Sequence, residues 1–261
     1  MTIPFIMFNE IYRRFLLVWS YRFNLLMQLL MIALIFLGAA FFLGHGQIDP
    51  QQAPSMLLGY GVWCYARITL LEGTFFLSVE AQSGTLEQMY MSPVSASFLL
   101  VGRMLAMLIS TTIVLIVPVG ILALLLHVSI PFHWLALPVL LIALAGLFGL
   151  SMILSGAVLV FKQVDNLADL LQNALLFLAG TLVPLSSFPR WLAIISQMFP
   201  LSQGIVVLRE VSFGDQSLAT IWANGSLPWL LVQTVLYVCV GWATFKICER
   251  VAMHKGLLGQ Y

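Results

Sequence analysis

Charge is the scarcest property of this 261-residue sequence, because Asp, Glu, Lys and Arg make up only 8% of it and hydrophobic residues make up 61%. A soluble domain carries roughly 25% charged residues, so this chain has too few to face water on every side. The formal net charge of +1 also excludes the clustered basic residues of a nucleic-acid interface. The composition therefore predicts an integral membrane protein that contacts the lipid bilayer and no nucleic acid.

The sequence also lacks the motifs of common catalytic and metal sites. Its three cysteines, Cys64, Cys239 and Cys248, lie in or beside apolar runs, and their spacing supports neither a disulfide framework nor a metal site. Gly-x-x-x-x-Gly-Lys-Ser/Thr, His-Glu-x-x-His and Gly-x-Ser-x-Gly motifs are all absent, so no P-loop for ATP is present. We expect a protein that is not an enzyme, with no catalytic residue, metal or cofactor of its own.

Six apolar runs are long enough to be membrane spans, since roughly 20 apolar residues cross the hydrocarbon core. The runs comprise residues 23–43, 56–79, 104–126, 134–160, 168–185 and 227–245. The loops between them are short and contain no repeat or low-complexity segment. The sequence therefore predicts an all-α, multi-pass membrane protein in which residues 1–261 form one transmembrane domain.

Lys and Arg are unevenly distributed between the two ends of these spans. With the N-terminus inside, the inner ends carry Arg13, Arg14, Arg22, Arg103, Lys162, Lys246, Arg250 and Lys255, and the outer side carries Arg190 and Arg209. Inner loops of membrane proteins are enriched in these residues. Both termini are therefore predicted to be cytoplasmic, in a plasma membrane or bacterial inner membrane.

The first 22 residues have an amphipathic pattern. Apolar residues recur near helical spacing at Phe5, Phe8, Tyr12 and Phe15, among other positions, while the opposite side carries residues such as Glu10 and Arg14. This pattern predicts a helix that lies at the inner membrane interface. A cleavable signal peptide is not expected, because a full-length span follows without a convincing cleavage site.

A polar segment at residues 80–93 separates the second span from the third. Its Thr-Leu-Glu-Gln-Met-Tyr-Met core is amphipathic and compatible with about two helical turns, with Gly84 before it and Pro93 after it. Such a helix is too small to be a domain but is suited to be a docking surface. The predicted topology places it in the cytoplasm.

The pattern Glu-x-x-x-Gly-Thr-Leu-Glu-x-x-x-x-Ser-Pro in this segment resembles the cytoplasmic coupling loop of type-2 ABC exporter permeases. The resemblance implies that an ATPase subunit presses on this loop to drive transport. The residues implied in the contact are Glu80, Gly84, Thr85, Leu86, Glu87 and Pro93. It further implies two ATPase subunits, which bind ATP and magnesium, and a second permease, either an identical copy or a close relative.

Residues 186–211 are predicted to form a re-entrant helical hairpin on the outer side. The ten mostly apolar residues between Pro189 and Pro200 are too few to cross the membrane, and proline interrupts a continuous helix. A second short helix follows and carries Arg209 and Glu210. The run is similar to the external hairpin of type-2 exporters, and its candidate residues are Phe188, Pro189, Trp191, Pro200, Arg209 and Glu210.

Two ionisable residues, Arg67 and Glu72, lie inside the second predicted span, where charge is costly and usually has a purpose. A spacing of five places them about 140° apart on a helix, so they are not expected to pair directly. Two interpretations stay open, a gate or transport path and a role in helix packing. In the fourth span, the pairs Ala145–Gly149 and Ser151–Ser155 follow the small-x-x-x-small pattern, which predicts close helix packing within the subunit.

With this resemblance, the chain is expected to be the permease subunit of an ATP-driven ABC exporter. Its cargo would be amphipathic or lipid-linked, such as a drug, a lipid or a glycan, and would move outward. The alternative is a secondary transporter or channel that works alone. Proteins of that class often contain inverted repeats, and none is visible between residues 1–127 and 128–261.

Overall fold

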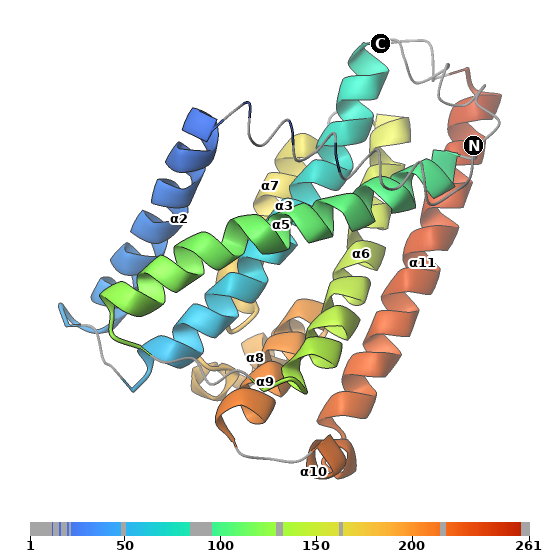
Figure 1. Ribbon diagram of the computed structural model, residues 1–261. Coiled ribbons are helices and arrows are strands. Elements are labelled where there is room, and N and C mark those ends of the chain that lie inside the picture. The colour runs from blue at the N-terminus through green and yellow to red at the C-terminus, as the bar shows by residue number, and fades with distance from the viewer. Residues whose placement is uncertain are drawn as a thin grey trace.

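The computed structural model describes residues 12, 16, 20, 22–47, 51–83, 96–128, 133–161, 164–214 and 218–256, and these contain helices but no strand. The expected all-α class is therefore confirmed for this part of the chain (Figure 1). In chain order the elements are α2 (Arg22–Leu43), α3 (Ala53–Gln82), α5 (Ala96–Leu125), α6 (Ala136–Phe161), α7 (Asp165–Leu178), the 3-10 turn η1 (Leu185–Ser187), α8 (Arg190–Gln197), α9 (Pro200–Phe213), α10 (Leu218–Ala223) and α11 (Ser226–His254). The interfacial helix predicted for residues 1–22 lies almost wholly outside the described residues.

Two helices, α6 and α11, have both the length and the hydropathy of a membrane span within the described residues. The pair α8 and α9 would supply a third if it is one broken span. Helices α3 and α5 contain 30 residues each, which is about 45 Å and exceeds the ~30 Å hydrocarbon core. The chain is thus a helical membrane protein, and the total of six spans stays a prediction.

The fifth predicted span ends earlier than expected. Helix α7 contains 14 residues, about 21 Å, and is too short to cross the bilayer alone. Its helix ends at Leu178, whereas the apolar run continues to residue 185. Gly180 adopts a φ of 70°, a conformation that favours glycine over other residues, and Pro184 follows in an extended conformation. These residues turn the chain away from the helix axis.

Helix α11 packs along α6 at two glycines. A side-chain carbon added to Gly149 would collide with the backbone of Tyr237, and one added to Gly241 would collide with the Gly149 carbonyl. Two helix backbones approach this closely only where side chains are missing. The prediction that Gly149 serves packing within the subunit is therefore confirmed.

Helix α6 is joined to α3 by two buried serines. The Ser151 hydroxyl donates to the Thr69 carbonyl at 2.9 Å, and the Ser155 hydroxyl donates to the Gly73 carbonyl at 3.1 Å. Small residues allow the approach, and their hydroxyls add a polar contact that no water competes for. Ser151 and Ser155 therefore also serve packing within the subunit, as predicted.

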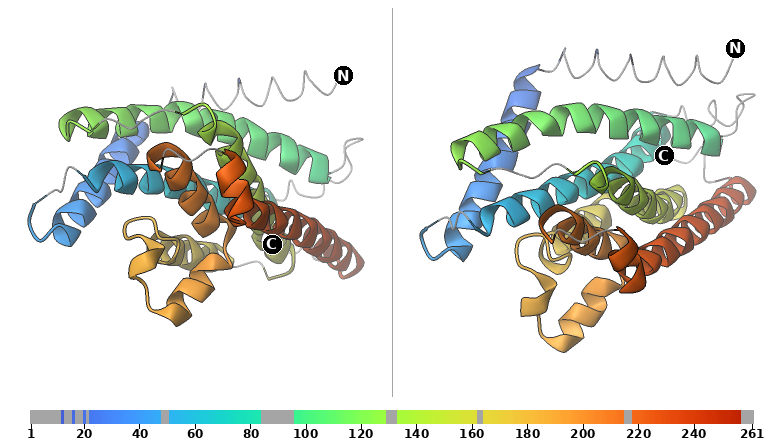
Figure 2. Two further views of the ribbon diagram at one scale, coloured as in Figure 1. Left: turned by 90° about the horizontal axis from the view of Figure 1, so that it is seen from below. Right: turned by 60° about the horizontal axis from the view of Figure 1, so that its bottom comes forward.

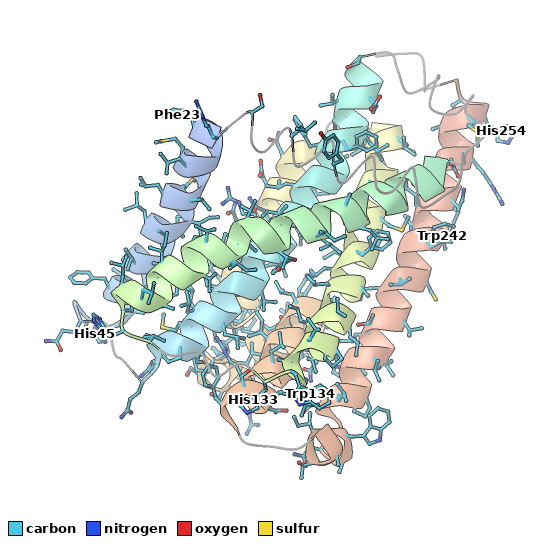
Figure 3. The ribbon with its side chains drawn as sticks, viewed as in Figure 1. Phe23, His45, His133, Trp134, Trp242 and His254 are labelled. Carbon is cyan, nitrogen blue, oxygen red and sulfur yellow. The ribbon has the colours of Figure 1, made fainter. Side chains whose placement is uncertain are left out.

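The two ends of the helix bundle can be named by labelled residues. Figure 3 shows Phe23 and His254 at one end, the Phe23 end, and His133 and Trp134 at the opposite end, the His133 end. The short helices α8, α9 and α10 lie at the His133 end (Figure 1). In both views of Figure 2, α5 lies on one side of α3, and α8 and α9 lie on the other. The start of α2 and the end of α11 share an end, as the predicted topology requires.

The predicted break at Pro200 is present. Helix α8 ends at Gln197, α9 begins at Pro200, and the two helices, together called the bent pair, are bent by 97°. Pro200 occupies the first position of α9, where the missing N–H costs nothing and the ring favours helix initiation. Re-entry of the bent pair into the bilayer stays a prediction.

Arg209 fastens the bent pair to α3 and to the residues that follow α7. Its guanidinium donates to the Gly180 carbonyl at 2.7 Å, to the Thr181 carbonyl at 2.8 Å, and to the Ser55 carbonyl of α3 at 3.2 and 3.3 Å. Gly180 and Thr181 follow the end of α7 and are buried. Their carbonyls therefore lie outside the hydrogen-bond pattern of the helix and need another donor. A side-chain carbon on Gly59 would meet this guanidinium at 2.8 Å.

Replacing Arg209 should therefore destabilise the fold. Arg209→Ala leaves three carbonyls without their charged donor, which should cost about 2–4 kcal/mol and lower the apparent Tm by about 5–10 °C. Arg209→Lys should be intermediate, because an ammonium lacks the planar fork that reaches several carbonyls at once. Thermal unfolding of the detergent-purified protein measures both. Arg190→Ala is the matched control, since Arg190 is exposed. An Arg209→Ala protein as stable as this control would contradict the anchoring role.

Candidate functional site

A cavity of about 520 Å³ lies between the bent pair and the beginning of α11. Its polar lining comes from Gln197, Gln203, Arg209, Glu210, Asn224 and Ser226, and its apolar lining includes Leu185, Val206 and Trp229. Its volume falls within the range typical of small-molecule sites, about 300–1,000 Å³. Within the described residues, no three His, Cys, Asp or Glu side chains come together as metal ligands would.

Hydrogen bonds between the bent pair and α11 hold the cavity walls. The Gln203 side-chain amide donates to the Ser226 carbonyl at 3.1 Å, and Gln203 is only 7% exposed. From α11, the Gln233 amide donates to the Gln197 carbonyl at the end of α8. These amides are polar residues inside apolar helices, where an unpaired amide would be costly. They therefore fix the distance between the bent pair and α11.

The two charged residues of the cavity have different surroundings. Arg209 directs four N–H groups to backbone carbonyls, so its guanidinium is largely used within the fold. The Oε2 atom of Glu210, by contrast, is shielded from water and has no hydrogen-bond partner. Among the described residues no cation pairs with Glu210. The cavity thus contains a carboxylate with unused acceptor capacity.

The other predicted residues of the hairpin are dispersed. Pro200 is buried, and its ring lies where a side chain on Gly146 would be. Phe188 is half-buried, and Pro189 precedes the first turn of α8. Trp191 is 64% exposed and does not line the cavity. Of the six predicted residues, the structure brings only Arg209 and Glu210 to this cavity.

Helix α8 exposes several large apolar side chains. Ile194 is 61% exposed, and Trp191, three residues earlier, is also exposed. Met198, directly after the helix, is 62% exposed. In water such a surface would be unfavourable. At a membrane interface the same surface is stabilised, and tryptophan is enriched there. The exposed side of α8 is therefore suited to contact lipid.

Arg67 has a partner on its own helix. Its guanidinium carbon lies 5.9 Å from the centre of a Trp63 ring, within the range of a cation–π contact. The Trp63 Nε1 atom in turn donates to the Gln172 carbonyl of α7 at 2.8 Å. This arrangement is what the packing interpretation of Arg67 requires, while a gating role stays a prediction. The side chain of Glu72 lies outside the described residues.

Of the six residues named for the coupling contact, Glu80 alone lies among the described residues. It is half-buried near the end of α3, whereas Gly84, Thr85, Leu86, Glu87 and Pro93 lie outside the described part of the chain. Helix α3 ends and α5 begins at the Phe23 end of the bundle (Figure 1). The segment that joins them therefore leaves and rejoins the bundle at the end opposite the cavity.

Several residues of the cavity were not predicted from the sequence. Gln203, Ser226 and Trp229 come from segments that only the folded chain brings together. Outside the cavity, Ser55 offers Arg209 a backbone carbonyl that no side-chain pattern reveals. One signal was available for Gln203, since a lone amide in an apolar helix usually has a partner. The sequence alone could not identify that partner.

Comparison with known proteins assigns the chain to a family. The family model described as ABC-2 type transporter matches residues 6–213, which is well over half of the chain and includes the bent pair and the segment after Glu80. No curated protein matches the sequence. The chain therefore belongs to the ABC-2 type transporter family and is the membrane permease component of an ABC transporter.

Proposed function

We propose that this chain is the permease of an ATP-driven exporter that moves an amphipathic or lipid-linked cargo out of the cell. The family match over residues 6–213 carries this proposal. Permeases of this family work with an ABC ATPase partner. In the proposed complex two ATPase subunits bind ATP and magnesium, and a second copy of the chain completes the membrane part.

Helix α3 is suited to transmit a movement of the ATPase subunits to the opposite end of the permease. At its far end the segment after Glu80 would contact the ATPase, and near its first turn the Ser55 carbonyl accepts hydrogen bonds from Arg209. One continuous helix of 30 residues therefore joins the predicted ATPase contact to the bent pair. If α3 moves along or across its axis, the hydrogen bonds between Ser55 and Arg209 would transmit this movement to the cavity wall.

The bent pair is proposed to re-enter the membrane from the outside and to cover the cargo exit. Three observations support this: the 97° bend, its position at the His133 end of the bundle (Figure 1), and the exposed apolar side chains of α8. The cavity beneath it would then be the last site that cargo occupies before release.

The first prediction of the proposed function concerns the coupling segment. Glu87→Arg reverses a charge at the proposed ATPase contact, and Gly84→Pro restricts the backbone before it. Both variants should insert normally but lose most ATPase activity of the complex in lipid and most co-purification with the ATPase subunit. Arg190→Ala, exposed on α8, is the control and should behave as the unmodified protein. Normal co-purification and ATPase activity in both variants would rule out coupling through this segment. Transport of cargo by the chain without the ATPase would favour the secondary-transporter alternative.

The second prediction concerns topology. In a variant without Cys64, Cys239 and Cys248, a cysteine at position 47 should react with an impermeant maleimide on intact cells. A cysteine at position 83 should react only after the inner face is opened. Gln47 and Ser83 are both exposed on the protein, so the membrane alone decides which is labelled. The reverse pattern would overturn the cytoplasmic placement of both termini and of the coupling segment.

A further inference from the structure

We infer that the cavity between the bent pair and α11 binds the cationic group of an amphiphilic cargo, with Glu210 as the counter-ion and Trp229 as an aromatic wall. The inference rests on the proposed export function and adds a substrate class and a site to it. It is carried by the charge, the lining and the position of the cavity.

The charge of the cavity favours a cation. Four N–H groups of Arg209 already donate to backbone carbonyls, so little remains with which to bind an anionic ligand. The Oε2 atom of Glu210 is shielded from water and has no hydrogen-bond partner. A carboxylate in a largely apolar site is costly unless a positive charge compensates for it. A cationic ligand would supply that charge.

The lining matches a ligand that is partly apolar. Trp229 is 49% exposed and borders the cavity with Leu185 and Val206, so it offers a ring face for a cation–π contact and apolar area for a hydrophobic body. Gln197 and Asn224 lie at the rim and are exposed. A neutral polyol would use these amides but would leave Glu210 uncompensated. An organic ammonium or phosphonium ion uses both the charge and the apolar wall.

The position of the cavity suits the end of a transport cycle. Its lining residues belong mainly to α8, α9 and the start of α11, which lie at the His133 end, opposite the end at which α3 ends and α5 begins (Figure 1). Gln203 and Gln233 tie its two walls together by hydrogen bonds, so an apolar cation would enter a formed site. Cargo held there would be separated from the ATPase by the length of α3.

Equilibrium binding of radiolabelled tetraphenylphosphonium tests the inference directly. The full-length protein is placed in phosphatidylcholine nanodiscs, and empty nanodiscs give the background from partition into lipid. We expect saturable binding that Glu210→Gln weakens by about tenfold or more, because it removes a charge at close range. Trp229→Ala should weaken it by about threefold or more. Glu210→Asp retains the charge and should bind the ligand more tightly than Glu210→Gln. This comparison shows that the weaker binding comes from the lost charge and not from loss of folding.

Two controls separate charge from shape and from general effects. Tetraphenylborate has the same shape and the opposite charge, so it should not compete for the site. Asp169→Asn removes a carboxylate that is exposed near the start of α7, far from the cavity, and should leave binding unchanged. Absence of saturable binding, an unaffected Glu210→Gln variant, or effective competition by the borate would each overturn the inference. None of these results would affect ATPase co-purification, which tests the proposed function separately.

Discussion

The fold of this protein depends on the hydrogen bonds of Arg209. Helix α7 ends at Leu178, and the residues that follow it are buried outside any helix, so their backbone carbonyls must find other donors. The Arg209 guanidinium supplies them to Gly180 and Thr181 and also reaches Ser55 of α3. It thereby satisfies the buried turn after α7 and fastens the bent pair both to this turn and to α3. The space for it exists because position 59 is glycine.

The long helices could be predicted from the sequence because the thickness of the hydrocarbon core sets their length. Predicted spans at residues 23–43 and 134–160 correspond to α2 and α6 within two residues at each end. Hydropathy predicted the end of the fifth span wrongly, because the residues after Leu178 are still mostly apolar although they are no longer helical. The local signal was Gly180 followed by Pro184, which mark a turn whatever the hydropathy. The break at Pro200 was predicted by the same kind of signal.

The candidate site was less predictable, because it depends on contacts between distant segments. Arg209 and Glu210 could be singled out as charged residues in an apolar run, but the sequence assigns Arg209 only to the outer side and reveals none of its partners. The structure shows that it bonds to backbone carbonyls, and these are present at every residue and leave no trace in a sequence. Ser226 and Trp229 reach the cavity only because α11 packs on α6 through Gly149 and Gly241.

The contacts within the subunit bear on where a transport path could open. Helix α3 is bonded to α2 through Tyr60, to α7 through Trp63, to α6 through the serine contacts, and to α9 through Arg209. Helix α11 is held against α6 by backbones that touch. Packed elements of this kind move together rather than deform. In the proposed exporter, a push on the end of α3 would therefore displace these helices as one body, and the path would open between two permease subunits rather than through the middle of one.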